Sequence, residues 1–336
     1  MTPSVLTIIL NYRTPELTLR AAEAAVREME GIRGEIVVVD NGSADDSVEW
    51  LAAAFDARGW TRSGAVTFKQ TGRNGGFGAG NNFAIRAGMS DGSAPDFVYL
   101  LNSDAWPQPG AIRRLLDHVT SDRACGIAGS FIEGPDKTPH TTAFRFPSAA
   151  GEFEGAVRTG VVSRLLRKSV VPLPIPDRTT RVGWVAGASA MIRRRMLDEI
   201  GLFDETFFLY YEETDLCLRA ARAGWQTHYV PASVVTHVGS ASTGMKLWRR
   251  TPRYWFDSRL HYFVKNHGRA YAAAATLARM TGAALWRMRV AVSSRPLGDP
   301  PNFLWDLTAH SVRGILRRPS AGNRPPAPPA IAEKTE

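Results

Sequence analysis

The sequence predicts an α/β fold: a doubly wound, mostly parallel sheet with helices on both faces, followed by a C-terminal helical extension. Short apolar runs typical of buried strands alternate with segments in which apolar residues recur at helical spacing. The first strands each end in a cluster of Asn, Asp, Ser or Gly residues. Because open α/β sheets bind ligands at the carboxyl ends of their strands, we expect a binding site along that edge.

Composition narrows the class of protein. A chain of 336 residues with 44% hydrophobic residues can bury one large core or two smaller ones. The two cysteines, Cys125 and Cys217, lie far apart among apolar neighbours, so their spacing predicts neither a disulfide framework nor a zinc site. This cysteine usage predicts a reducing, cytoplasmic location, and no charged leader or cleavage site accompanies the first strand, so we expect no secretory signal.

Positive charge is concentrated near the carboxyl terminus. From residue 240 onward sixteen Lys and Arg residues stand against five Asp and Glu residues, whereas the first 239 residues are nearly neutral. A basic tail suits nucleic acid, anionic lipid or simple solubility. These basic residues are not interleaved with a recognisable recognition helix, so we predict no nucleic-acid partner.

The first two strands each lead into a polar loop and then a helix. Residues 4–10 form the first predicted strand, which ends at Asn11, and residues 35–39 form the second, which ends at Asp40 and Asn41. A helix follows each loop, as expected for parallel strands joined by crossovers. Both polar loops should therefore lie on the same edge of the sheet.

A further strand ends in the most informative polar cluster of the chain. The apolar run over residues 97–101 leads into Asn102-Ser103-Asp104, and Pro107 prevents the strand from continuing. Asn102 and Asp104 lie two residues apart, so in an extended chain they share a face and could reach a divalent cation that carries diphosphate oxygens. A capped turn after a core strand is the alternative interpretation.

A glycine-rich segment lies between these strands. Residues 71–82 form a predicted loop, which leads into a helix over residues 83–88. The backbone N–H groups of such a loop can approach a phosphate, and Arg73 could add a charge-assisted contact. Asn81 stands where a dinucleotide fingerprint would need its last glycine, so that fingerprint is absent. A loop without a ligand is the alternative.

Taken together, the motifs of this chain resemble those of family 2 glycosyltransferases, in particular the bacterial rhamnosyltransferase-like branch. The resemblance covers roughly residues 4–268 and rests on the order of several motifs, each of which is weak alone. They are Asn11-Tyr12-Arg13, Val38-Val39-Asp40-Asn41-Gly42-Ser43, Asn74-Gly75-Gly76-Phe77, Gly80-Asn81-Asn82, Leu101-Asn102-Ser103-Asp104, Gly183-Trp184-Val185-Ala186-Gly187-Ala188, Tyr210-Tyr211-Glu212-Glu213-Thr214-Asp215 and His237-Val238-Gly239-Ser240.

The resemblance implies a GT-A fold and transfer of a sugar, with rhamnose the leading candidate, from a nucleoside-diphosphate donor to a hydroxyl of a saccharide or lipid-linked saccharide. Transfer would invert the anomeric carbon with the help of Mg²⁺ or Mn²⁺ and a carboxylate general base. The residues implied are Glu213 as base; Asp104 and His237 for the metal; Asn11, Arg13, Asp40, Asn41, Arg73, Asn74, Asn81, Asn102 and Ser103 for the donor; and Trp184, Gly187 and Glu212 for the acceptor.

Two positions depart from the family pattern. Asn102 replaces the first aspartate of the metal-binding triplet, so Asp104 carries most of the predicted metal contact. Glu213 replaces an aspartate and adds one methylene to the predicted base. These departures leave open an alternative function, a catalytically inactive module that binds nucleotide sugars, which turnover would distinguish from an enzyme.

The acidic cluster before residue 216 also has a structural interpretation. Glu212, Glu213 and Asp215 could be first-turn acids of a helix, where carboxylates favour the amino-terminal dipole. We expect Asp215 to orient this turn and to pair with Arg219 or Arg222 one helical turn later.

The sequence suggests three domains. Residues 1–240 form the GT-A domain, with a donor half over 1–130 and an acceptor half over 131–240, and residues 134–181 are predicted to be a mobile lid or a disordered insertion. Residues 241–318 form a basic helical extension, and residues 319–336 are predicted to be disordered.

The extension contains one stretch with the length of a membrane span. Three arginines interrupt residues 271–292, and a charge at the bilayer centre costs several kcal/mol, so spanning is disfavoured. We expect this helix to lie on the anionic inner face of the cell membrane. A helix packed on the enzyme domain is the alternative.

Overall fold

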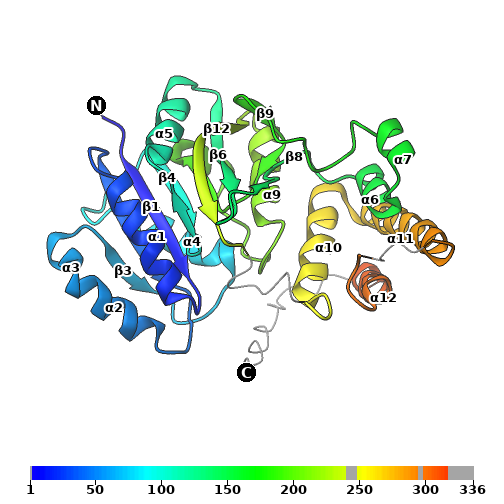
Figure 1. The fold of residues 1–336 in the computed structure, drawn as a ribbon, viewed down its shortest axis with the longest axis horizontal. Helices are drawn as coiled ribbons and strands as arrows, with labels where there is room; N and C mark the ends of the chain where they lie inside the picture. The colour runs from blue at the N-terminus through cyan, green and yellow to red at the C-terminus, as the bar shows by residue number, and fades with distance from the viewer. Residues whose placement is uncertain (1, 240–247, 294–297, 317–336) are drawn as a thin grey trace.

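The structure, a computed structural model, describes residues 2–239, 248–293 and 298–316 (Figure 1). The predicted domain boundary at residue 240 and the predicted disordered tail over 319–336 lie outside the described residues. Up to residue 144 the elements are β1 (Val5–Asn11), α1 (Pro15–Glu28), β2 (Gly34–Asp40), α2 (Ser47–Ala57), α3 (Trp60–Ser63), β3 (Thr67–Gln70), α4 (Phe77–Ala87), β4 (Phe97–Asn102), β5 (Ala105–Pro107), α5 (Ala111–Ser121), β6 (Cys125–Glu133), β7 (Pro139–His140) and β8 (Ala143–Phe144).

Helices dominate the second half of the chain. From residue 149 onward the elements are α6 (Ala149–Val157), α7 (Gly160–Leu165), β9 (Thr180–Val182), β10 (Trp184–Val185), β11 (Ser189–Arg193), α8 (Arg194–Ile200), α9 (Glu212–Arg222), β12 (Gln226–His237), α10 (Arg253–His267), α11 (Arg269–Ala291) and α12 (Phe303–Leu316).

Among the described residues the main sheet has ten strands, and its central order is β3-β2-β1-β4-β11-β6-β12-β5. β3, β2, β1 and β4 are mutually parallel, whereas β11 runs antiparallel to both of its neighbours. Asn11 is paired with Asp40 in register, and Leu10 is paired with Asn102. The carboxyl ends of β1, β2 and β4 therefore meet at one edge, as the sequence predicts.

Apolar helix faces cover both sides of this sheet. One buried cluster joins the sheet to α1, α2 and α5, and a second joins it to α4, α8 and α9. The strands alternate between the two clusters, with Ile9 in the first and Ile8 in the second, and both residues are fully buried. The predicted α/β arrangement with helices on both faces is confirmed.

The glycine-rich loop is shorter than predicted. Helix α4 begins at Phe77, so Gly80, Asn81 and Asn82 are helical and the prediction of a loop to residue 82 was wrong. A Cβ atom on Gly80 would lie 2.5 Å from the Leu10 side chain. The glycine thus lets α4 pack closely against β1, which favours helix despite the low helical propensity of glycine.

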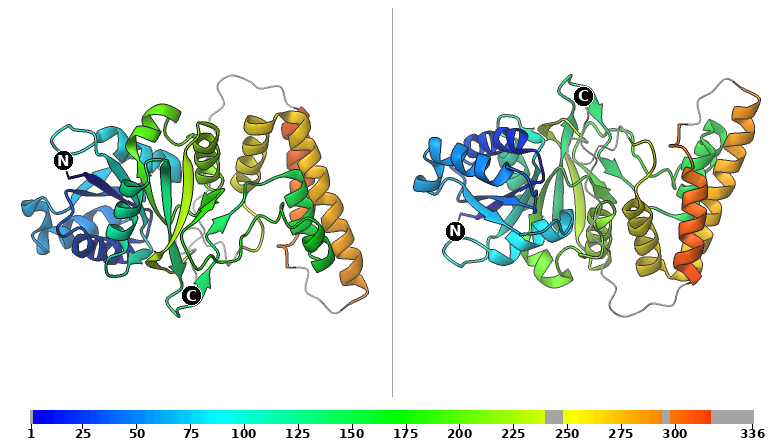
Figure 2. Two further views of the ribbon diagram at one scale, coloured as in Figure 1. Left: turned by 90° about the horizontal axis from the view of Figure 1, so that it is seen from above. Right: turned by 90° about the horizontal axis from the view of Figure 1, so that it is seen from below.

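Residues 134–181 are also more ordered than predicted. They carry strands β7, β8 and β9 and helices α6 and α7, so the alternative of a disordered insertion was wrong. Figures 1 and 2 show α6 and α7 beside α10, α11 and α12, in a helical layer at one end of the sheet domain. A Cβ on Gly282 would lie 2.7 Å from the Phe153 carbonyl oxygen, so α11 and α6 are in close contact.

A buried ion-pair network joins this helical layer. Arg259 of α10 is 1% exposed and its guanidinium lies 2.9 Å from the Glu152 carboxylate of α6. Arg279 of α11 contacts the same carboxylate at 3.4 Å. Two basic residues of the extension are therefore used for internal packing. Within the residues that the structure describes, no helix has the length and apolar character needed to cross a membrane.

Candidate active site

The site is built first from the ends of β1 and β2. Asn11 is fully buried and donates a 2.8 Å hydrogen bond from Nδ2 to Asp40 Oδ1. Asp40 Oδ2 accepts from the backbone N–H groups of Gly42 and Ser43 at 3.1 and 3.0 Å. Arg13 also binds this loop, because its Nε donates to the Ser43 carbonyl at 2.8 Å. These contacts hold the polar loops of two strands in one arrangement.

A second group of amides connects this edge to the glycine-rich segment. Asn41 Nδ2 donates to Asn74 Oδ1 and to the Gly76 carbonyl, both at 3.1 Å. Gly76 has φ of 90°, and a Cβ there would lie 2.0 Å from the Phe208 carbonyl oxygen. This position therefore requires glycine both for its backbone conformation and for the close approach of the segment before α9.

The remaining predicted donor residues of this segment differ in exposure. Arg73 is exposed beside the loop, whereas Asn81 is buried and donates from Nδ2 to the Phe77 carbonyl within α4 at 2.9 Å. The structure thus leaves Arg73 available to a ligand and gives the Asn81 side chain a bond inside its own helix.

The predicted metal-binding residues come together from three places in the sequence. Asp104 follows β4, is 4% exposed, and its Oδ1 atom lies 2.9 Å from His237 Nε2 at the end of β12. Asn102 Nδ2 lies 3.3 Å from the same imidazole nitrogen. Ser103 accepts a hydrogen bond from Thr14 at 3.1 Å, which ties the turn to the start of α1.

This donor set fits a divalent cation. A carboxylate oxygen and an imidazole nitrogen are ligands that Mn²⁺ binds, and Mg²⁺ binds the oxygen. The Asn102 atom nearest the imidazole is the amide nitrogen, which is not a metal ligand. Asp104 Oδ1 and His237 Nε2 are already neighbours, so both could face one ion. The pairing of β12 with β5, with His237 opposite Ala105, positions the histidine beside the β4 turn.

The predicted base lies at the start of α9. Burial raises the pKa of Glu213 to about 7, although hydrogen bonds from its own backbone N–H and from that of Gly187 act in the opposite direction. Burial and repulsion from Glu213 raise the pKa of Glu212 well above its usual range. The Oε2 atoms of both carboxylates are buried and have no hydrogen-bond partner among the described residues.

The backbone before these glutamates has an unusual conformation. Tyr210 and Tyr211 both have φ of 70°, which is uncommon for residues other than glycine and costs free energy. Their rings are held by aromatic neighbours, with Tyr254 beside Tyr210 and Tyr262 beside Tyr211. Both neighbours belong to α10, so the C-terminal extension supports the turn that presents the two carboxylates.

A short segment links the two halves of the site. The Ala188 carbonyl accepts a 3.0 Å hydrogen bond from the Asn102 backbone N–H, next to the predicted metal-binding turn. The preceding residue, Gly187, is the one whose N–H contacts Glu213. Two consecutive residues therefore connect the predicted metal site to the predicted base.

The side chain of Trp184, predicted to bind the acceptor, is half-buried and already contacts its neighbours. Its indole ring stacks on Phe144 with centroids 4.0 Å apart and planes inclined by 15°. The indole N–H donates to the Arg145 carbonyl at 3.0 Å. One face of this ring is thus already covered by the β8 strand.

The sequence did not predict a set of polar contacts that join α9 to α10. Asp215 is fully buried and its carboxylate lies 2.8 Å from Lys265 and 2.9 Å from Asn266 of α10. Arg219 also pairs with Asp215 at 2.9 Å, as predicted, whereas Arg222 binds Asn266 instead. No local signal identifies Lys265, because it lies fifty residues from its partner in the sequence.

The sequence of this chain is similar to those of known glycosyltransferases. The model of the family described as glycosyl transferase family 2 matches residues 4–201. N-acetylglucosaminyl-diphospho-decaprenol L-rhamnosyltransferase of Mycobacterium tuberculosis is 31% identical over 221 residues, which cover 62% of this chain and 68% of the relative. Rhamnosyltransferase WbbL of Escherichia coli K12 is 28% identical over 165 residues, 48% of this chain and 60% of the relative.

Solved structures support the fold. The mannosyltransferase PcManGT from Pyrobaculum calidifontis, in complex with GDP-Man and Mn²⁺, has a TM-score of 0.52 at 18% identity, with 94% of this chain and 88% of that chain covered. GalNAc-T7 with UDP, GalNAc and Mn²⁺ has a TM-score of 0.55 at 14% identity, covering 92% of this chain and 54% of that chain. The chain has the GT-A fold and belongs to glycosyl transferase family 2.

Proposed function

We propose that this glycosyltransferase transfers a sugar, with rhamnose the leading candidate, from a nucleoside-diphosphate donor to a hydroxyl of a lipid-linked or cell-surface saccharide, inverting the anomeric carbon. The observation that carries the proposal is a short backbone connection: the Asn102 N–H, two residues before Asp104, donates to the Ala188 carbonyl, and the N–H of the preceding residue, Gly187, contacts Glu213. It supports a site with a cation on the leaving-group side and a base on the acceptor side.

The donor nucleotide would bind along the carboxyl edge of the sheet. The loops after β1 and β2 are held rigid by the bonds among Asn11, Asp40 and Ser43, so polar groups there need little reordering to bind a ligand. Arg13 and Arg73 supply positive charge at this edge and suit diphosphate oxygens. Asn41, Asn74 and Asn81 would complete this side of the site, Asn81 by shaping α4.

The metal would be held by Asp104 and His237, with the Asn102 side chain beside them. When bound, such an ion neutralises charge on the departing diphosphate. The β4 turn positions these donors because Ser103 is bonded to Thr14 and the Asp104 carbonyl accepts the Val238 N–H at 3.0 Å. Mn²⁺ in both similar solved structures supports this assignment.

Glu213 would accept the proton of the attacking acceptor hydroxyl. A pKa raised to about 7 suits a base that works near neutral pH, since such a group is ionised for part of the time and still binds a proton strongly. Burial and the neighbouring Glu213 carboxylate raise the pKa of Glu212 well above its usual range, so its protonated form can donate a hydrogen bond to the acceptor. Gly187 and Trp184 would line the acceptor side.

The membrane is a further proposed partner, because the acceptor of the mycobacterial relative is named as a decaprenol derivative. Large apolar side chains are exposed on three helices of the helical layer, and those on α11 recur within one face. They are Val161 and Leu165 on α7, Leu277, Leu285, Met288 and Val292 near α11, and Trp305 and Val312 on α12. Arg164, Arg287 and Arg313 stand among them, which suits an anionic lipid surface.

Vesicle sedimentation tests the membrane partner. We expect the full chain to bind vesicles that contain anionic phospholipid, and Leu285→Asp with Met288→Asp to weaken binding at least tenfold. Trp50→Asp, at an exposed apolar residue on α2, is the matched control and should bind normally. Equal binding by the α11 double variant and the control would exclude this surface.

Nucleotide release tests the proposed enzyme. A panel of nucleoside-diphosphate sugars with Mn²⁺ or Mg²⁺ is assayed with the wild type, Asp104→Ala and Glu213→Gln. We expect one donor to be turned over, both variants to lose turnover, and Glu213→Gln to keep donor binding. If the wild type binds donor yet releases no nucleotide with any acceptor extract, the chain is an inactive nucleotide-sugar-binding module instead.

A further inference from the structure

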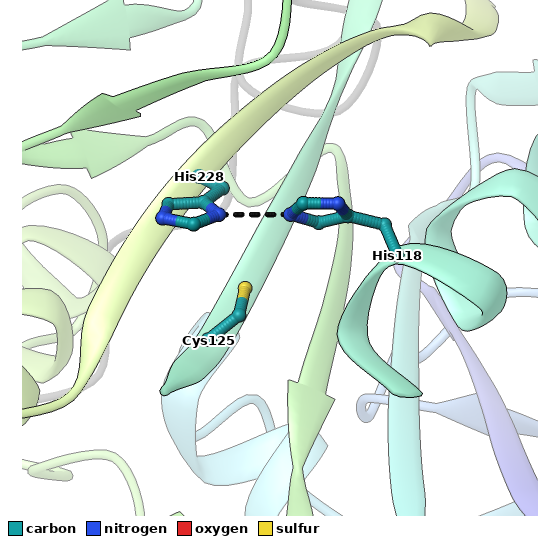
Figure 3. Close-up of side chains that lie close together, drawn as sticks. All are labelled: His118, Cys125 and His228. Atoms are coloured by element: carbon teal, nitrogen blue, oxygen red, sulfur yellow. Dashed lines mark hydrogen bonds between the residues drawn. The ribbon is translucent and has the colours of Figure 1, made fainter. Parts of the chain in front are cut away.

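A cluster of possible metal ligands lies away from the active site. His118 of α5, Cys125 at the start of β6 and His228 near the start of β12 each direct one donor atom inward, and these atoms lie within 4.8 Å of one another (Figure 3). His228 and His237 belong to the same strand and are nine residues apart, roughly 30 Å along an extended chain. The cluster is therefore at the opposite edge of the sheet from Asp104.

We propose that His118, Cys125 and His228 form a binding site for Zn²⁺ or a transition-metal ion of similar preference. Two imidazole nitrogens and one thiolate sulfur are the donors that Zn²⁺ selects, whereas Mg²⁺ prefers oxygen ligands. The proposal stands on this cluster alone and does not depend on the proposed sugar transfer.

The histidines are arranged as ligands usually are. His228 Nε2 lies 2.9 Å from Gln226 Oε1, which accepts its proton and leaves the Nδ1 lone pair directed toward His118. His118 Nε2 lies 2.8 Å from that Nδ1 atom, so both nitrogens point into the same small space. Burial lowers the pKa of each imidazole, which keeps both rings neutral and able to coordinate near pH 7.

The turn that carries the cysteine is held in place. Arg193 donates from Nε to the Cys125 carbonyl at 3.1 Å and from Nη2 to the Asp122 carbonyl at 3.0 Å. Asp122 Oδ2 lies 3.7 Å from His228 Nδ1 and is a possible fourth ligand. The carboxylate and a thiolate together would balance the two charges of the cation.

Metal binding would replace a proton on sulfur. Burial raises the pKa of the Cys125 thiol to about 12, so without metal it stays protonated and donates to the Ile127 carbonyl at 3.3 Å. On binding, the S–H bond breaks, the proton passes to solvent, and the sulfur electron pair forms the metal bond. The ion would then connect α5 to β6 and β12 at the rim of the sheet.

Cobalt binding tests the site in the full chain after removal of metal by chelation. Co²⁺ bound through a thiolate gives a sulfur-to-metal charge-transfer band in the near ultraviolet, which the oxygen and nitrogen ligands of the active site cannot produce. We expect this band at one equivalent of Co²⁺, and we expect Zn²⁺ to displace it. Cys125→Ala should abolish the band, and His118→Ala, at a half-buried position, should weaken binding at least tenfold.

The second cysteine provides the matched control. Cys217 is also buried and its thiol pKa is also raised to about 12, but no histidine joins it in a cluster among the described residues. Cys217→Ala should therefore keep the band unchanged. The proposal is overturned if the wild type gives no band, or if His118→Ala and Cys217→Ala behave alike.

Discussion

Replacing the predicted base should stabilise the folded protein at alkaline pH. Glu213 is half-buried at the start of α9, its Oε2 atom is buried without a partner among the described residues, and burial raises its pKa from 4.5 to about 7. The folded chain therefore holds this proton more tightly than the unfolded chain does. As pH rises from 4.5 to 7, the free energy of unfolding falls, and the stability contributed by this proton is fully lost above about pH 7.

The size of the effect follows from the two pKa values. At about 1.4 kcal/mol for each tenfold change in an ionisation constant, the difference between 4.5 and about 7 corresponds to about 3 kcal/mol. Glu213→Gln keeps the shape and removes the ionisation. We compare the free energy of unfolding of this variant with that of the wild type at each pH. The variant's advantage should be larger at pH 8.5 than at pH 4.5, by about 3 kcal/mol.

Urea unfolding at these two pH values, without metal or donor, is the assay. Glu205→Gln is the matched control, because hydrogen bonds from Asn82 and Arg86 lower the pKa of Glu205 despite its partial burial. That variant should gain no stability at pH 8.5. If Glu213→Gln follows the control, or loses stability as pH rises, Glu213 is an ordinary ionised carboxylate and the reasoning about the base is refuted.

Three further results are expected. The initial rate of nucleotide release should rise with pH through about 7, because the base must be ionised to accept a proton; a rate that falls through this range would contradict the assignment. Lys265→Met should cost about 1–3 kcal/mol in urea unfolding, since it removes one of the two cations that pair with the buried Asp215 carboxylate of α9, whereas Arg86→Met, in an exposed pair, should cost less than about 1 kcal/mol. Gly76→Ala should lower the free energy of unfolding by about 2–4 kcal/mol through its positive φ and its clash with Phe208, while Gly155→Ala, with open space around it, should be neutral or stabilising; equal effects of the two would refute the close approach.

The sheet edge could be predicted because its residues depend on local patterns. Asn11, Asp40 and Asn102 each end an apolar run, and the ends of parallel strands must lie at one edge. Local patterns alone could not predict that Asp104 and His237 lie together, because β12 joins the sheet late in the sequence. The resemblance implied that they share a metal, and in the structure Asp104 Oδ1 and His237 Nε2 lie 2.9 Å apart.

The parts that could not be predicted depend on contacts between distant segments. Lys265 meets Asp215 across fifty residues, and no periodicity in either helix indicates that pairing. The spacing of Cys125 gave no sign of the proposed metal site because His228 lies on a strand more than one hundred residues away. The packing of α6 on α11 orders residues 149–157, which the sequence alone suggested to be mobile.

The most direct test of the proposed function is formation of the glycosidic bond itself. Labelled sugar from dTDP-rhamnose is followed into a polyprenyl-diphosphate-linked N-acetylglucosamine acceptor, with the wild type and Glu213→Gln compared at equal donor occupancy. We predict transfer with inverted anomeric configuration by the wild type, and a loss of at least a hundredfold in the variant. Equal transfer by both proteins, or a product with retained configuration, would contradict the role of Glu213 as the base of a single displacement.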